Sequence, residues 1–195
     1  NLPAIVNAWE PGMMGGQAVA EILYGKVNPS AKLSMTIPRT AGQVQMYYNH
    51  KPSHYRYKLQ DIPNEPLYPF GFGLSYTTYE YSDLQLSKSE IAPNENIDVS
   101  VTVKNTGARE GVEIAQLYIR DCISFVTRPV KELKGFQRVA LKAGESKRIS
   151  FTLTPEHLRY YNLNMERVVE PGTFEVMVGG SSRDKDLLTA EFEVK

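Results

Sequence analysis

The sequence predicts a mostly β protein, in which a partial α/β segment precedes an antiparallel β-sandwich. From about Thr77 to the end, apolar and polar residues alternate with a period of two, which is typical of half-buried strands. Near the N-terminus the apolar spacing is instead that of a helix. We therefore divide the chain into an α/β part (1–45), an aromatic-rich linker (46–76) and the sandwich (77–195).

The α/β part begins with an apolar run over residues 3–8, which predicts a buried strand. A helix is expected from about Gly15 to Tyr24, and Gly25 stands where a left-handed helix cap belongs. The residues that place the helix recur at a spacing of three to four and share one face: Ala18, Val19, Ile22 and Leu23.

A second strand is expected over residues 33–37, ended by Pro38. Two strands and one helix cannot close a two-sided sheet, so strands buried in a larger layer would here have bare edges. We expect residues 1–75 to pack against the sandwich, to pair between chains in self-association through exposed strand edges, or to be poorly ordered. Ordered, unpaired strands around Ile5 and Met35 would contradict this expectation.

The sandwich is expected to contain roughly seven short strands, separated by turn signals such as Asn105-Thr106-Gly107 and Gly179-Gly180. This pattern is typical of the immunoglobulin or fibronectin III fold. The chain has a single cysteine, Cys122, so an antibody-type Cys–Trp–Cys arrangement is excluded. The alternating runs are Ile97–Val103, Ala115–Ile119, Ile149–Leu153, Phe174–Val178 and Phe192–Val194.

Charge and composition exclude several classes of function. Lys plus Arg is 22 and Asp plus Glu is 22, so nothing in the charge favours nucleic acid or an anionic membrane as a partner. One cysteine allows no intrachain disulfide and no cysteine-based zinc cluster, and we find no functional interpretation for it. The three histidines lack metal-ligand spacing, so neither a metal nor another cofactor is expected.

Two sets of residues are weak candidates for a site. Glu10 follows the first predicted strand, where sites often lie in α/β sheets, but an acidic residue there more often favours the start of a helix. Tyr48, His50 and Tyr55 belong to an aromatic stretch that could border a sugar pocket. The same tyrosines could equally pin a linker to the fold, and the residues leave both interpretations open.

Several segments, taken in order, resemble glycoside hydrolase family 3 of the β-glucosidase and β-xylosidase type, over nearly the whole chain. The most specific is Pro69-Phe70-Gly71-Phe72-Gly73-Leu74-Ser75-Tyr76-Thr77. The others are similar to the end of that family's α/β sandwich domain and to its fibronectin III-like domain: Ala8-Trp9-Glu10-Pro11-Gly12, Asn28-Pro29-Ser30-Ala31-Lys32-Leu33, Arg128-Pro129-Val130-Lys131-Glu132-Leu133-Lys134-Gly135-Phe136 and Glu170-Pro171-Gly172.

The resemblance implies a larger retaining β-glycosidase that hydrolyses terminal bonds of oligosaccharides. Its nucleophilic aspartate and acid/base glutamate would both lie upstream of the matched segments, so no residue of this chain is assigned a catalytic role. The partners implied are the upstream catalytic domains of the same polypeptide and the oligosaccharide substrate, and a periplasmic or secreted bacterial location is expected. A stand-alone carbohydrate-binding or structural sandwich is the alternative.

One departure from the family pattern limits what the resemblance says about substrate. After Lys51 only Pro52-Ser53-His54 precede Tyr55-Arg56-Tyr57, where family members usually have a longer loop.

Overall fold

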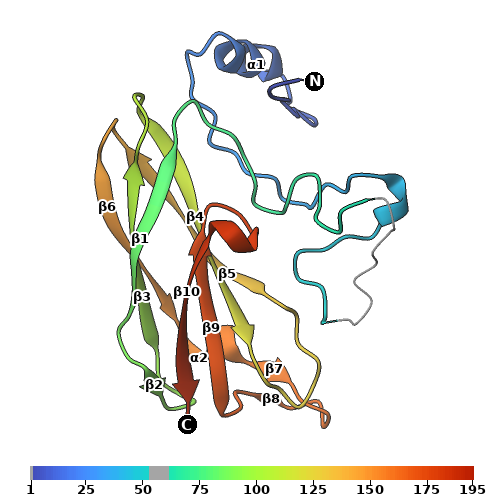
Figure 1. The fold of residues 1–195 in the computed structure, drawn as a ribbon, viewed down its shortest axis with the longest axis vertical. Coiled ribbons are helices and arrows are strands. Elements are labelled where there is room, and N and C mark those ends of the chain that lie inside the picture. Colours follow the sequence, from blue (N-terminus) through green and yellow to red (C-terminus); the bar gives the residue numbers. More distant parts are fainter. Residues whose placement is uncertain (1, 53–61) are drawn as a thin grey trace.

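The structure is a computed structural model that describes residues 2–52 and 62–195, and their main body is a β-sandwich (Figure 1). One sheet has the order β1-β3-β6, and the other has the order β2-β10-β9-β4-β5. The first comprises β1 (Tyr79–Leu86), β3 (Ile97–Asn105) and β6 (Ser146–Leu153). The second comprises β2 (Glu90–Ile91), β10 (Leu187–Val194), β9 (Gly172–Gly179), β4 (Gly111–Asp121) and β5 (Glu132–Leu141). The predicted sandwich is thus confirmed.

Smaller elements decorate the sandwich. A hairpin of β7 (Tyr160–Tyr161) and β8 (Arg167–Val168) follows the short helix α2 (Pro155–Leu158). Two 3₁₀ turns lie at Ala41–Gln43 and Asp184–Asp186. The pairings between the sandwich strands are antiparallel except for the two-residue parallel pairing of β2 with β10.

The core lies between the two sheets, where the alternating side chains meet. In β3 the apolar residues are fully buried while Asp98 and Lys104 face solvent, as the period of two predicts. Phe174 and Phe192 stack at 5.5 Å between centroids on neighbouring strands β9 and β10. This closed core explains why the sandwich can be stable by its own packing.

Strand β4 departs from simple alternation because both of its faces are covered. Gln116 and Tyr118 are 3% and 0% exposed although they lie on the face away from the sandwich core. They are covered by residues 48 and 70–71 of the preceding segment. The second face of β4 is therefore where the N-terminal part meets the sandwich.

Two long strands, β1 and β5, were not among the predicted alternating runs. The alternation of β1 is interrupted between Ser82 and Gln85, where the register shifts and Asp83 has a left-handed φ of 54°. Strand β5 is an edge strand, and its exposed Phe136 hides the period from a pattern of apolar residues.

The predicted strand over residues 3–8 is wrong, because these residues form no regular strand and lie exposed. No neighbouring strand is present among the described residues to supply the hydrogen bonds that a β-strand requires. The predicted strand over 33–37 is reduced to one bridge, between Ile37 and Tyr68. Neither stretch is therefore an ordered, unpaired strand.

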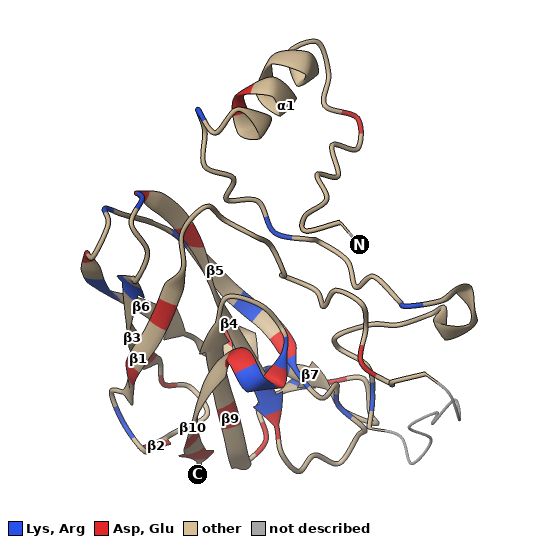
Figure 2. Ribbon diagram, turned by 45° about the horizontal axis from the view of Figure 1, so that its top comes forward, with Lys and Arg blue, Asp and Glu red and all other residues tan. Residues whose placement is uncertain are grey.

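The predicted helix is confirmed as α1 (Gly15–Leu23), followed by Gly25 with a left-handed φ of 68°. Only Gly15 is buried in this helix, and Leu23 is 65% exposed. Figure 1 shows α1 held away from the sandwich on extended chain. Figure 2 shows few charged residues along this tail, so its exposed surface is largely uncharged.

Candidate functional site

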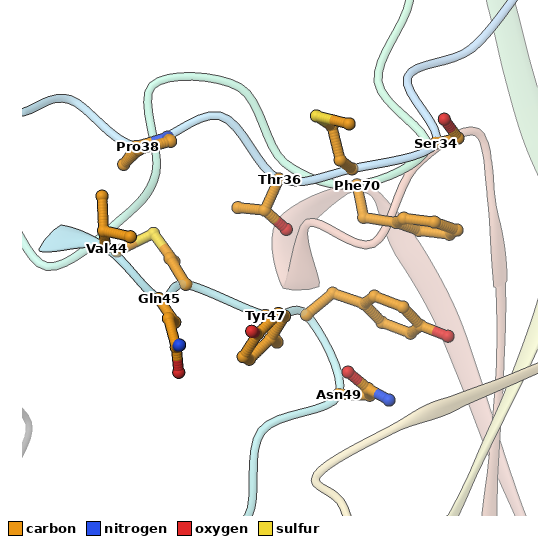
Figure 3. Close-up of a pocket in the computed structure, with 11 residues that line it drawn as sticks. Ser34, Thr36, Pro38, Val44, Gln45, Tyr47, Asn49 and Phe70 are labelled. Atoms are coloured by element: carbon orange, nitrogen blue, oxygen red, sulfur yellow. The ribbon is translucent and has the colours of Figure 1, made fainter. Parts of the chain in front are cut away.

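An open hollow of about 400 Å³ lies between the N-terminal tail and the linker. Figure 3 shows its two opposing chain segments, with Thr36 and Pro38 on one and Val44, Gln45 and Tyr47 on the other. The full lining is Ser34, Met35, Thr36, Pro38, Val44, Gln45, Met46, Tyr47, Tyr48, Asn49 and Phe70. Its mixture of apolar side chains with a few amides and hydroxyls is typical of small-molecule sites.

Tyr48 lines the hollow and fixes the linker to the sandwich. Its ring stacks on Phe70 at 4.2 Å and meets Tyr118 edge-on at 5.8 Å. Its hydroxyl oxygen accepts a hydrogen bond from the backbone N–H of Leu133 at 3.3 Å. This predicted site residue therefore acts as a structural pin, although it also lines the hollow.

Tyr47, the preceding residue, is 57% exposed and lines the same hollow. Gln45 and Asn49 are exposed beside it and also line the hollow. Sequence reasoning named Tyr48 and not Tyr47, because nothing in the pair Tyr47-Tyr48 says which ring Phe70 will cover.

The other sequence candidates do not join the hollow. Nδ1 of His50 lies 2.9 Å from the backbone oxygen of Lys51, and the backbone oxygen of His50 accepts a hydrogen bond from Val130. Glu10 is exposed on the N-terminal tail. Tyr55 lies outside the described residues. The structure thus leaves Tyr48 as the one sequence candidate among the described residues that line the hollow.

The wall of the hollow that carries Phe70 is held by Gln116 of β4. Its Nε2 donates to the backbone oxygens of Gly71 at 3.1 Å and Gly180 at 2.8 Å. Its Oε1 accepts a hydrogen bond of 2.5 Å from the hydroxyl of Tyr118. Gly71 has a left-handed φ of 75°, and a Cβ there would overlap the Gln116 amide. These contacts explain why the Pro69–Thr77 motif needs glycine at this point.

Asn28 joins the tail, the motif and the sandwich. Its Oδ1 accepts hydrogen bonds from Ser75 Oγ at 2.9 Å and Tyr76 N at 2.8 Å. Its Nδ2 donates to the backbone oxygen of Glu110 at 2.9 Å. One amide side chain therefore ties three separate segments together, which accounts for Asn28 in the Asn28–Leu33 motif.

A buried ion pair strengthens the same junction. Lys32 Nζ lies 3.1 Å from Glu113 Oε2, and their side chains are 15% and 5% exposed. The hydroxyl of Tyr81 donates to Glu113 Oε1 at 2.9 Å. Burial, together with the negative charge of Glu113, raises the pKa of Tyr81 well above its usual value. We call these contacts of residues 25–37 and 67–76 with the sandwich the seam.

A second polar cluster lies beneath the loop between β4 and β5. Arg128 Nη1 lies 3.5 Å from Asp121 Oδ2, and Nη2 donates to Glu132 Oε1 at 2.8 Å. The hydroxyl of Tyr160 donates to Glu170 Oε2 at 2.7 Å, and the Arg128 guanidinium lies 4.9 Å above the Tyr160 ring. Arg128 and Glu170 lie in the motifs found in the sequence, and the structure gives them a structural role.

The Asp121 carboxyl stands out within this cluster. Its side chain is 1% exposed, and its Oδ1 has no hydrogen-bond partner among the described residues. Burial raises the pKa of Asp121 from 3.8 to about 6, although the positive charge of Arg128 opposes the shift. The neighbouring Cys122 thiol also has a raised pKa because of burial, so it stays protonated at neutral pH.

Within residues 2–52 and 62–195, no three His, Cys, Asp or Glu side chains gather as a metal site would require. None of the helices in these ranges has the length and apolar character needed to cross a membrane.

Comparison with known proteins identifies the family. Residues 1–76 match the glycosyl hydrolase family 3 C-terminal domain, and residues 113–182 match the fibronectin type III-like domain. A solved β-glucosidase from Erythrobacter marinus superposes on the chain with a TM-score of 0.95 at 42% identity. The chain belongs to glycosyl hydrolase family 3. It corresponds to the C-terminal part of family 3 enzymes of the β-glucosidase and β-xylosidase type.

Two curated family 3 relatives show how much of such an enzyme is present. A putative β-xylosidase of Formosa agariphila is 46% identical, over 93% of this chain and 24% of that protein. A periplasmic β-glucosidase of Salmonella typhimurium is 43% identical, over 92% of this chain and 25% of that protein. The Erythrobacter superposition covers 100% of this chain and 26% of that one. The chain thus spans about a quarter of the length of the relatives it matches.

Proposed function

We propose that this chain is the non-catalytic C-terminal portion of a retaining β-glycosidase, whose sandwich stabilises the catalytic domains. The parent would hydrolyse terminal glycosidic bonds of oligosaccharides, and the chain would divide into the tail (1–45), the linker (46–76) and the sandwich (77–195). The observation that carries this proposal is the contrast between a closed sandwich core and an open tail.

The tail exposes apolar side chains that a folded domain would bury. The exposed fractions are 65% for Ile5, 64% for Trp9 and 65% for Leu23, and Met13 is fully exposed. Large apolar side chains exposed in such number favour a place where another protein surface docks. The upstream domains of the same polypeptide are the proposed partner, because the family relatives are about four times as long as this chain.

The seam explains how the sandwich would support those domains. Asn28 and the Lys32–Glu113 pair hold the base of the tail, residues 25–37, on the sandwich. Gln116 holds Gly71 of the linker beside them. A segment whose base is already fixed loses less conformational entropy when its free end joins a neighbouring domain. The sandwich would therefore preorganise the last part of the catalytic domain.

The positions of Asp121 and Glu170 in the second polar cluster support the proposal that this chain is not catalytic. Retaining hydrolysis needs two carboxyl groups ~5–5.5 Å apart on either side of a sugar bond. Asp121, with its raised pKa, and Glu170 have the right chemistry, but both are at least nine-tenths buried and bonded to protein groups. Glu170 Oε2 is occupied by the Tyr160 hydroxyl and Asp121 Oδ2 lies beside Arg128, so these oxygens are engaged in contacts within the sandwich.

The direct test is turnover of an aryl β-glucoside by the purified chain. We expect no release of the phenol above the uncatalysed rate between pH 4 and pH 8. Release that is lost in Asp121→Asn or Glu170→Gln would show that the cluster is an active site and would overturn the non-catalytic assignment.

A further inference from the structure

We propose that the hollow between residues 34–38 and 44–49 binds an uncharged pyranose ring, with Tyr47 as the stacking surface. The proposal rests on the proposed function for its choice of a sugar as ligand, and it adds a binding site to a chain that has no assigned one. It also replaces Tyr48, the residue suggested by the sequence, with its neighbour.

The size and lining of the hollow fit such a ring. Its volume of about 400 Å³ lies within the ~300–1,000 Å³ of most small-molecule sites. The lining combines apolar groups from Met35, Val44 and Phe70 with polar groups that can donate and accept hydrogen bonds. A pyranose has the same character, since its C–H faces are apolar and its hydroxyls lie around the edge.

The charge of the lining selects the class of ligand. None of the described residues that line the hollow carries a charged side chain. A phosphate or carboxylate ligand would find no counter-charge here, and burying an unpaired charge is costly. The hydroxyl of Thr36, which points toward the opposing segment in Figure 3, suits a neutral hydroxyl group instead.

Tyr48 supports the wall of the hollow, and Tyr47 is the residue proposed to contact the ligand. Tyr48 is fixed by Phe70, Tyr118 and Leu133, so the chain that carries Tyr47 is held in place. Tyr47 itself is 57% exposed, which leaves its ring accessible. A positioned aromatic ring loses little side-chain entropy on binding and offers a large apolar surface.

The test is a titration of the ¹⁵N-labelled chain with methyl β-D-glucopyranoside and methyl β-D-xylopyranoside, followed by amide chemical shifts. We expect saturable shifts confined to residues 34–38, 44–49 and 70, with a dissociation constant on the order of a millimolar, as befits a small neutral ligand. Tyr47→Ala should weaken binding at least tenfold. Thr36→Val, which keeps the shape and removes the hydroxyl, should weaken it several-fold.

Tyr161→Ala is the matched control. Tyr161 is also 57% exposed, but it lies on the β7–β8 hairpin of the sandwich. Its substitution should leave the titration unchanged. Shifts that do not saturate, that map elsewhere, or that weaken equally in both tyrosine variants would overturn the inference. The experiment contains no catalytic step, so that failure would leave the proposed function to its own test.

Discussion

At the scale of single residues, Gly71 tests whether the Pro69–Thr77 motif is a packing device. Gly71→Ala places a methyl group at a left-handed φ, which costs about 1–2 kcal/mol, and also displaces the Gln116 amide. Gly144 has the same φ of 75° with no atom within 4 Å of an added Cβ, so Gly144→Ala isolates the backbone cost. We expect urea unfolding to show a larger loss of stability for Gly71→Ala, and equal losses would contradict the role of Gln116.

The buried carboxyl of Asp121 makes the stability of the chain depend on pH. Because the folded pKa of Asp121 is about 6 and its ordinary value is 3.8, the folded state holds the proton more tightly. Its contribution to stability is fully present below pH 3.8 and is lost as the pH rises through 6. This difference between the two pKa values of Asp121 corresponds to about 3 kcal/mol in the free energy of unfolding.

Asp121→Asn removes this titration while it keeps the shape of the side chain. The stability difference between the native chain and the variant should therefore change between pH 4 and pH 6 and become constant above pH 7. Chemical denaturation at a series of pH values measures it. Parallel stability profiles for the two proteins would mean that Asp121 is not protonated in the folded state at pH 5.

The sequence predicts which residues of β3 are buried, but it does not predict the burial of Gln116. The alternation of apolar and polar residues correctly predicted the core residues of β3, because one face of that strand is buried and the other faces solvent. The same rule treats Gln116 as exposed, although a second layer covers it. A polar residue covered by a distant segment leaves no local signal in the sequence, so the seam could not be predicted from periodicity.

At the scale of elements, the seam is predicted to hold the base of the tail. Lys32→Met leaves Glu113 buried without its counter-charge, and breaking such a pair commonly costs about 3–5 kcal/mol. Hydrogen exchange should accelerate at residues 28–37 and 67–76 more than in β3 and β9. Lys26→Met is the control, because Lys26 is 72% exposed in its pair with Glu21 and should contribute little. Unchanged hydrogen exchange at residues 28–37 and 67–76 in Lys32→Met would contradict the proposed role of the seam.

The elements of the tail explain why its strands were predicted wrongly. Residues 3–8 are as apolar as a buried strand, but a strand is stabilised by hydrogen bonds to a neighbouring strand. The helix α1 satisfies its own backbone groups, so it forms where the strand does not. Sequence therefore predicted the self-contained element correctly, and it failed for the element that depends on a partner.

The helix α1 is proposed to dock on the upstream domain through its exposed Leu23. Leu23→Asp should leave the thermal stability of the isolated chain nearly unchanged, since Leu23 is 65% exposed and touches little. In a complete enzyme the same change should destabilise the contact with the upstream domain and lower activity at least tenfold, because it buries an unpaired charge. Leu163→Asp is the control, because Leu163 is 83% exposed on the β7–β8 hairpin at the other end of the molecule (Figure 1). Equal effects of the two changes would contradict docking through α1.

At the scale of the whole molecule, the chain combines a sandwich that has a buried core with a tail whose helix buries only Gly15. The sandwich buries its own core, whereas the tail leaves most of its large apolar side chains exposed. Both match the C-terminal region of family 3 enzymes that are about four times as long. We propose that this chain supplies support to such an enzyme and no catalytic carboxylate.

The most direct test is a chimera in which this chain replaces the matching quarter of the Salmonella typhimurium β-glucosidase, assayed on an aryl β-glucoside. We expect the chimera to be active, and the relative truncated before this region to be inactive or unstable. Full activity of the truncated relative would contradict the supporting role. Activity of the chimera that depends on Asp121 or Glu170, measured as loss of kcat without loss of folding, would contradict the claim that this chain carries no catalytic carboxylate.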